Sequence, residues 1–178
     1  MHCPELLTAR LALRELDPDA LSADYVGWLN DPAINQYLEV RHAPQDAAGV
    51  AAFVRDINAS DHSYLFGIHL REAGDHIGNI KLGPVDRRNL RGDIGYLIGD
   101  RSQWSKGYAG EAIAAVTRFA FDTLGLQKVC AGVYAPNTAS IGTLRKQGFR
   151  EAGRRLRHWR TDDGWADDVL MEKLSGDA

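Results

Sequence analysis

The residues best suited to chemistry are the eight from Trp104 to Glu111, which read Trp-Ser-Lys-Gly-Tyr-Ala-Gly-Glu. They follow an apolar run and lead into a strongly amphipathic one, so they predict a turn that opens a helix. The first N–H groups of a helix lack intrahelical partners and carry the positive end of its dipole. A glycine such as Gly107 also lets a ligand approach the backbone closely. The turn therefore predicts a site for a phosphate-bearing ligand, with Lys106 as either an added charge or a solvated side chain.

The helices and strands around this turn determine which ligand it can bind. Alternating apolar residues predict strands, and apolar residues at helical spacing predict helices. The first helix is expected to start at Asp17-Pro18, and Gly148 is expected to end the last one. The expected strands are residues 10–15, 64–70, 76–82, 93–99, 127–134, 150–160 and 165–174, and the expected helices are 17–30, 45–58, 109–124 and 138–147.

Two of these helices have a clear apolar face. In residues 45–58 that face is formed by Val50, Phe53, Val54 and Ile57. In residues 109–124 the opposite, exposed face is formed by Glu111, Ala115, Arg118 and Asp122, so Glu111 is interpreted as structural. Three successive strands with short connections favour an antiparallel meander. The whole order predicts one α+β domain over residues 1–178.

The composition is that of a soluble globular protein, with 44% hydrophobic residues, 25% charged residues and a net charge of −3. This balance indicates neither nucleic acid nor a membrane as a partner, and no apolar run is long enough to cross a bilayer. Cys3 and Cys130 lie far apart, and neither they nor the histidines have metal-ligand spacing, so no metal site is expected. The expected setting is the reducing cytoplasm.

The turn fits neither common nucleotide-binding motif. It lacks the Gly-Lys-Ser/Thr ending of a P-loop, and it follows three antiparallel strands instead of the first strand of a dinucleotide fold. Its pattern Trp104-x-x-Gly107-x-Ala109 instead resembles the acyl-CoA motif of the GNAT superfamily of N-acetyltransferases, with Trp104 replacing the usual Gln or Arg. The surrounding residues are similar to the branch that contains ribosomal-protein N-terminal acetyltransferases.

A second run resembles another motif of the same family and stands at the family's usual distance after the first: Asn137-Thr138-Ala139-Ser140-x-x-x-Leu144-x-Lys146-x-Gly148-Phe149. The resemblance covers nearly the whole chain. It implies a single GNAT-type domain with a mixed, mostly antiparallel sheet, flanking helices and a splayed pair of central strands.

The resemblance also implies acetyl-CoA as co-substrate. Its pyrophosphate is expected at the helix start, and its pantetheine arm between the splayed strands, paired with strand-edge backbone groups. Trp104 is interpreted as a packing residue. The expected contacts are Leu97, Ile98, Ser105, Lys106, Gly107, Tyr108, Ala109, Gly110, Asn137 and Ser140.

Acetyl transfer to an amine needs a base, an oxyanion donor and a proton for the departing thiolate. The resemblance implies Ser140 for the last role, with Tyr134 as a rival, whereas Asn137 either caps its helix or contacts pantetheine. Asp93 and Glu39 are the candidate bases, and a water chain is the alternative. The N–H of Ile98 is the candidate oxyanion donor. Cys130 is interpreted as a small core residue and not as an acyl-carrying nucleophile.

The acceptor is predicted to be a small-molecule or peptide amine. Tyr37, Glu39, Arg41 and Asn79 are the candidate binding residues, although a plain exposed sheet face is the simpler reading of Asn79. The runs at residues 37–41 and 78–84 resemble family members associated with amino-sugar acetylation in surface-polysaccharide pathways. This resemblance favours an amino sugar or a nucleotide-linked amino sugar, whose phosphates would need cations. The available cations are Arg41, Arg87, Arg88 and Arg91.

Two other functions remain open. One is acetylation of a protein N-terminus, and the other is a non-catalytic acyl-CoA-binding sensor module. The expected oligomeric state is a monomer or a homodimer.

Overall fold

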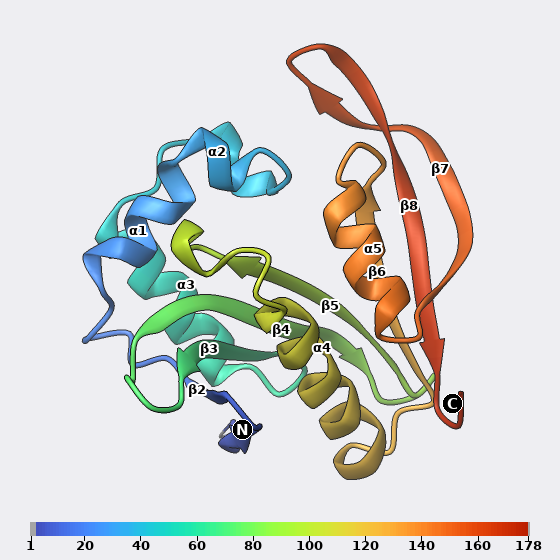
Figure 1. The fold of residues 1–178 in the computed structure, drawn as a ribbon, viewed down its shortest axis with the longest axis horizontal. Helices are drawn as coiled ribbons and strands as arrows, with labels where there is room; N and C mark the ends of the chain where they lie inside the picture. Colours follow the sequence, from blue (N-terminus) through green and yellow to red (C-terminus); the bar gives the residue numbers. More distant parts are fainter. Residues whose placement is uncertain (1–2, 178) are drawn as a thin grey trace.

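The computed structural model describes residues 3–177, in which eight strands form one sheet (Figure 1). The strands lie in the order β1-β2-β3-β4-β5-β6-β8-β7, and every neighbouring pair is antiparallel except β5 and β6. Their bounds are β1 Leu6–Leu7, β2 Leu11–Glu15, β3 Tyr64–Leu70, β4 His76–Asp86, β5 Arg91–Ile98, β6 Lys128–Tyr134, β7 Arg150–Thr161 and β8 Gly164–Leu174. The predicted meander and mixed, mostly antiparallel sheet are confirmed.

The described helices are α1 Ala23–Asn30, α2 Pro32–Asn35, α3 Ala47–Ala59, α4 Tyr108–Arg118 and α5 Thr138–Lys146. The predicted start at Asp17 was wrong: α1 begins after Ser22, whose hydroxyl accepts from the Tyr25 N–H. The Asp17 carboxylate instead accepts from the nearby Asp19 N–H and closes a turn. The short α2 lies between the helices expected at 17–30 and 45–58 and is capped by Asp31.

Helices pack against both faces of the sheet and bury two apolar clusters. The larger cluster joins α4 and α5 to one face, and the smaller one joins α1 and α3 to the other. Two predictions about helix faces were wrong. Phe53 of α3 is 48% exposed, because Val50 and Val54 already fill the contact with the sheet, and Ala115 of α4 is buried, because that helix is covered on a wider face than predicted.

The central strands β5 and β6 separate soon after they meet. Their parallel pairing covers only residues 91–93 of β5 and 128–130 of β6. Beyond that point the two strands diverge, as Figure 1 shows, and we call their divergent ends, residues 94–98 and 131–134, the fork. The splayed strand pair that the sequence resemblance implied is therefore confirmed.

The face of the sheet that carries α1 and α3 is called the acceptor face below. Side chains alternate between the faces of a strand. Leu97 packs in the α1–α3 cluster, whereas its neighbours Tyr96 and Ile98 pack against the α4 cluster. The same alternation puts Asp93 and Gly95 on the acceptor face of β5. On β6, Val129, Ala131 and Val133 belong to the α4 cluster, so Cys130, Gly132 and Tyr134 lie on the acceptor face.

No helix within residues 3–177 is long and apolar enough to span a membrane.

Candidate active site

The predicted turn opens α4 in a conformation suited to an anion. Ser105 and Gly107 both have left-handed backbones, with φ of +61° and +84°. Gly107 is the N-cap and makes no side-chain hydrogen bond, and the Glu111 N–H is 3.1 Å from the Gly107 carbonyl. The N–H groups of the first turn precede that bond, so they have no intrahelical partner. They can therefore bind the oxygens of a pyrophosphate.

Glu111 fastens this helix start to the edge of the sheet. Its carboxylate accepts from the Thr8 hydroxyl at 2.6 Å, from the Arg10 N–H at 2.8 Å and from Arg10 Nε at 2.7 Å. Partial burial acts against ionisation, but these hydrogen bonds outweigh it and hold the pKa of Glu111 below its usual value. Arg10 also donates to the Lys106 carbonyl at 2.9 Å. Glu111 is structural, as the sequence predicted.

Trp104 does not pack as predicted. Its side chain is 41% exposed, and its indole N–H donates to the Ile98 carbonyl at 2.8 Å. The indole thus covers the last carbonyl of β5 and holds the loop before α4 against the fork. Lys106 reaches Gln103 Oε1 at 3.0 Å and is otherwise exposed.

The edge of β5 determines which backbone groups face the fork. Successive residues of a strand direct their N–H and C=O groups to opposite edges. The Gly99 N–H donates to the Ile77 carbonyl of β4, so the backbone groups of Gly99 and Leu97 face β4, and those of Ile98 and Tyr96 face the fork. Ile98 thus keeps its predicted place at the strand edge. Leu97 reaches the acceptor face through its side chain, and its backbone does not face the fork. Tyr96 therefore joins Ile98 as a candidate for backbone hydrogen bonds to the pantetheine arm.

Ser140 lies beside a residue that the sequence analysis missed. Its Oγ is 2.7 Å from the hydroxyl of Tyr96, which projects from β5 towards α5. Asn137 caps α5, because its side chain accepts from the Ser140 N–H at 3.1 Å. Burial raises the pKa of Tyr96, although the hydrogen bond with Ser140 acts in the opposite direction. Alternation along β5 could have placed Tyr96 on the face of α5, but only tertiary packing brings the two hydroxyls together.

The rival donor, Tyr134, belongs to a different cluster. Its hydroxyl donates to the Glu39 carboxylate and accepts from Arg41 Nη1 at 2.6 Å. Tyr37 packs on the Tyr134 ring at 5.6 Å between centroids. Burial and then the Glu39 hydrogen bond raise the pKa of Tyr134 to about 12. The predicted substrate-side residues Tyr37, Glu39 and Arg41 are thus brought together at the open end of the fork.

Asp93 lies at the closed end of the fork, in register with Cys130. Burial raises the pKa of the Asp93 carboxyl, although the positive charges of Arg91 and Lys81 lower it in part. Burial and then the charge of Asp93 raise the pKa of the Cys130 thiol. A thiol kept protonated in this way is a poor nucleophile. The prediction that Cys130 is a core residue was wrong, because Cys130 is only partly buried and belongs to neither apolar cluster.

Asn79 is not on a plain exposed sheet face, because it is only 6% exposed. His76 Nε2 lies 2.9 Å from Asn79 Oδ1, whereas Asn79 Nδ2 is buried without a hydrogen-bond partner within residues 3–177. Asn79 is in register with Leu97 of β5, so it lies one strand away from the fork.

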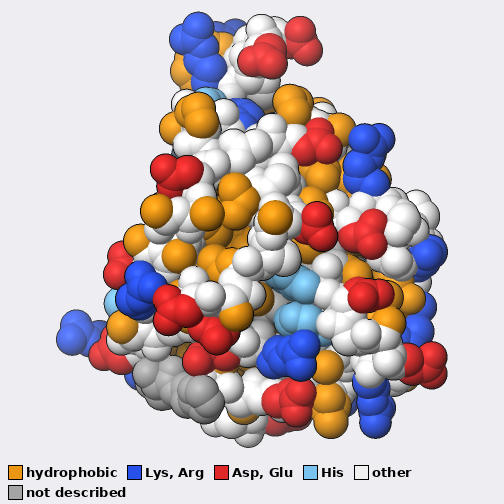
Figure 2. Space-filling view, turned by 90° about the vertical axis from the view of Figure 1, so that its left-hand side faces the viewer, with side chains coloured by type: hydrophobic (Ala, Val, Ile, Leu, Met, Phe, Trp, Pro, Cys, Tyr) orange, Lys and Arg blue, Asp and Glu red, His pale blue; other side chains and the backbone are white. Residues whose placement is uncertain are grey.

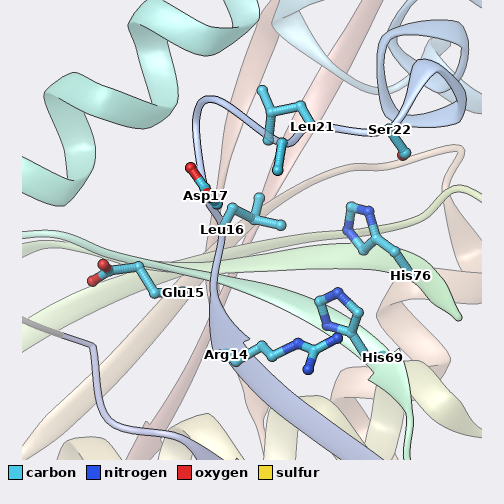
Figure 3. A pocket seen from close by; sticks show the side chains of 9 residues that line it. Arg14, Glu15, Leu16, Asp17, Leu21, Ser22, His69 and His76 are labelled. Carbon is cyan, nitrogen blue, oxygen red and sulfur yellow. The ribbon is translucent and has the colours of Figure 1, made fainter. Parts of the chain in front are cut away.

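A separate hollow of about 260 Å³ lies where β2 leads towards α1. Figure 2 shows histidine side chains at its floor, and Figure 3 shows Arg14 directed towards His69, with Glu15 pointing away. His69 and His76 stack at 4.9 Å between ring centroids. None of the residues predicted for catalysis lines this hollow. No group of three or more metal-ligating side chains occurs among the described residues.

A mixed sheet that forks between its parallel strands, with a ligand-ready helix start beside the fork, defines an acyl-CoA-dependent transferase fold. Residues 10–150 match the family model described as "Acetyltransferase (GNAT) domain", and the chain belongs to this family. It is an acetyl-CoA-dependent N-acetyltransferase.

Individual relatives agree with this assignment. The chain is 29% identical over 171 residues to the uncharacterized N-acetyltransferase p20 of Bacillus licheniformis, covering 95% of this chain and 94% of that protein. Spermidine N-acetyltransferase from Vibrio cholerae, solved with CoA and spermine, superposes with a TM-score of 0.83 at 18% identity, covering 96% and 98%. Mycobacterium smegmatis RimJ, solved with CoA-disulfide, gives 0.79 at 22%, covering 93% and 82%. At these identities the two structures establish the fold alone.

Proposed function

We propose that this enzyme transfers the acetyl group by direct attack of a primary amine on acetyl-CoA in a ternary complex. The pyrophosphate binds the backbone of residues 105–110, and the pantetheine arm lies along the fork with the thioester near Ile98. The Ile98 N–H supports the oxyanion. The setting is the cytoplasm, whose reducing conditions suit the two free thiols Cys3 and Cys130.

One observation carries this mechanism: the 2.7 Å contact between Tyr96 Oη and Ser140 Oγ beside the fork. A hydroxyl pair can stabilise the departing thiolate, because Ser140 donates a hydrogen bond to the sulfur while its own oxygen accepts one from Tyr96. The proton that the thiolate finally takes up is the one that the attacking amine loses. Tyr134 is the weaker candidate, since Glu39 and Arg41 already occupy its hydroxyl. The same contacts restrain Glu39, so Asp93 or water is the better candidate for the base.

The proposed acceptor is an amino sugar or a nucleotide-linked amino sugar. Arg41 stands at the open end of the fork, and Lys81 and Arg155 contribute positive charge near Asp93. These cations suit an acceptor with phosphates and do not suit a polyamine. Arg87 and Arg88 lie beyond the closed end of the fork, between β4 and β5, so they are left out of the proposed site.

Protein N-terminal acetylation is the second candidate. It is supported by the similarity in fold to RimJ and by the turn motif, whose residues resemble the ribosomal-protein branch. A non-catalytic sensor is less well supported, because the paired hydroxyls of Tyr96 and Ser140 have no evident use in binding alone.

The test is release of free CoA thiol from acetyl-CoA with a panel of amines. The panel contains glucosamine, UDP-linked amino sugars, peptides with free N-termini, and spermidine. Turnover with amino sugars alone supports the proposed acceptor. Turnover with peptides alone favours protein N-terminal acetylation instead. Acetyl-CoA binding measured by calorimetry, without thiol release above background for any amine, would establish the sensor instead.

A further inference from the structure

The Asp168 carboxylate of β8 accepts hydrogen bonds through one oxygen, whereas its other oxygen accepts none from the described residues. It is completely buried. Arg155 of β7 directs Nε and Nη2 to the same oxygen, Oδ2, with the Nε contact at 2.8 Å. Oδ1 is buried and has no hydrogen-bond partner within residues 3–177. A buried carboxylate oxygen without a hydrogen-bond donor lowers the stability of the folded protein, so such an oxygen in a native structure needs a physical explanation.

This unused oxygen lies at the β6 side of the fork. Asp168 is in register with Tyr134, and a Cβ placed on Gly132 would come within 2.9 Å of Asp168 Oδ1. Gly132 stands two residues past Cys130, the last residue of β6 that pairs with β5. Because Gly132 has no side chain, Oδ1 reaches over the β6 backbone on the acceptor face.

The oxygen is close to solvent although it is covered. Gly132 itself is exposed, and the Arg155 side chain is half-exposed. A ligand that enters the fork from its open end along the acceptor face would meet Tyr134 first and then the Cα of Gly132. The ligand would meet Oδ1 at the Cα of Gly132, on the side where no side chain is present, while Oδ2 kept Arg155 as its charged partner.

We propose that Asp168 Oδ1 accepts a hydrogen bond from the amine nitrogen of the acceptor and so positions it for attack. This inference rests on the proposed acetyl transfer and supplies its acceptor-binding carboxylate. Arg155 acts as a positioning residue, because its two hydrogen bonds to Oδ2 fix the carboxylate and keep its charge balanced. An amine or ammonium group offers the donors that Oδ1 lacks.

The other carboxylates near the fork fit this role less well. Asp93 lies at the closed end, in register with Cys130, where the two strands are still paired. Glu39 is held by the Tyr134 hydroxyl and by Arg41 at 3.3 Å. Asp168 alone, among the described carboxylates at the fork, combines a fixed position with an oxygen that has no partner.

The decisive variant is Gly132→Ala, which places a methyl group against Oδ1 without changing any charge. Its matched control is Gly153→Ala on the neighbouring strand β7, where an added Cβ meets nothing within 4 Å. Each variant is assayed by thiol release with glucosamine, or with whichever panel amine the wild type acetylates, and its acetyl-CoA affinity is measured by calorimetry.

We expect Gly132→Ala to raise the KM for the amine about tenfold or more, which is the usual effect of losing a hydrogen bond to a charged group. Its acetyl-CoA affinity should stay within about twofold of wild type, and Gly153→Ala should match wild type in both measurements. An unchanged KM for the amine in a folded Gly132→Ala variant would overturn the inference.

Asp168→Asn combined with Arg155→Gln provides a second arm, because removing both charges avoids a buried unpaired ion. The double variant should bind acetyl-CoA normally and show a similar rise in the KM for the amine. If the wild type binds acetyl-CoA yet acetylates no amine in the panel, the proposed function fails first and the role of Asp168 fails with it. If the wild type is active and both variants keep its KM, only the role of Asp168 fails.

Discussion

Tyr96 on β5 and Ser140 on α5 hold their hydroxyl oxygens 2.7 Å apart, although 44 residues separate them in the chain. The strand contributes the phenol, and the first turn of the helix contributes the serine hydroxyl. The side chain of Asn137 caps that helix by accepting from the Ser140 N–H. The pair therefore depends on a rigid strand and a capped helix, and both groups are oriented before substrate arrives.

Replacement of Ser140 by Ala should lower kcat by about a hundredfold, the lower range for loss of a general acid. Tyr96→Phe should lower kcat by less, because Ser140 remains as donor and loses only its partner. Acetyl-CoA affinity should be nearly unchanged in both variants. The control is Thr143→Ala on the same helix, whose hydroxyl donates to the Ala139 carbonyl at 2.9 Å. Full turnover in a folded Ser140→Ala enzyme would remove Ser140 from the mechanism.

Gly107→Val should weaken acetyl-CoA binding at least tenfold. Valine fits poorly at a φ of +84°, and its branched side chain would stand where the pyrophosphate approaches the backbone. Gly125→Val is a matched control, because Gly125 also has a positive φ of +68° and open space around it, but lies after the far end of α4. Both variants should lose thermal stability, and calorimetry should show weaker acetyl-CoA binding for Gly107→Val alone. Equal affinities in the two variants would place the pyrophosphate elsewhere.

Patterns local in the sequence predicted most of the fold. Alternation located the meander, and the glycine turn located the start of α4 within a residue. The start of α1 was misplaced because Asp17-Pro18 and Ser22 are both acceptable helix caps, and the choice depends on packing. Val50 and Val54 were correctly assigned to the core, whereas Phe53 was not, since periodicity cannot tell how wide a buried face is.

The sequence could propose only those parts of the candidate site that lie within one continuous segment of the chain. Residues 105–110 and Asn137-Ser140 are local motifs, so the sequence alone could propose them, and their contact with acetyl-CoA stays a prediction. Tyr96 and Asp168 were missed, because their importance comes from partners on other strands and helices: Ser140 for the first, Arg155 and Gly132 for the second. Cross-strand register over such separations has no local signal.

Glu111→Gln should destabilise the fold and loosen the helix start. The neutral amide retains one acceptor but loses the charge that Arg10 and Thr8 stabilise, a cost of about 1–3 kcal/mol. In a chain of this size such a cost lowers Tm by several degrees. Calorimetric unfolding should show this for Glu111→Gln and no change for Glu72→Gln, an exposed carboxylate in the β3–β4 loop. Equal Tm values in the two variants would mean that the carboxylate network contributes nothing measurable.

His69 should make the fold sensitive to mild acid. Burial, and then the nearby positive charges of His76 and Arg14, lower the pKa of His69 from 6.5 to about 4. The unfolded chain therefore binds the proton more readily between these pH values, and the free energy of unfolding falls as pH falls through them. By this linkage His69 removes at most roughly 3 kcal/mol by pH 4. Burial lowers the pKa of His76 as well, which adds to the same trend.

The measurement is urea unfolding at a series of pH values between 7 and 4 for wild type and His69→Gln, at about half-unit steps. His69→Gln should be less stable than wild type at pH 7, because it replaces a stacked and buried ring. Its unfolding free energy should nevertheless fall less steeply as the pH is lowered, so that the two curves converge towards pH 4. The control is His158→Gln on the exposed β7–β8 hairpin, which removes a histidine without removing a buried side chain. A His69→Gln curve that runs parallel to wild type would show that His69 does not hold its neutral form in the folded protein.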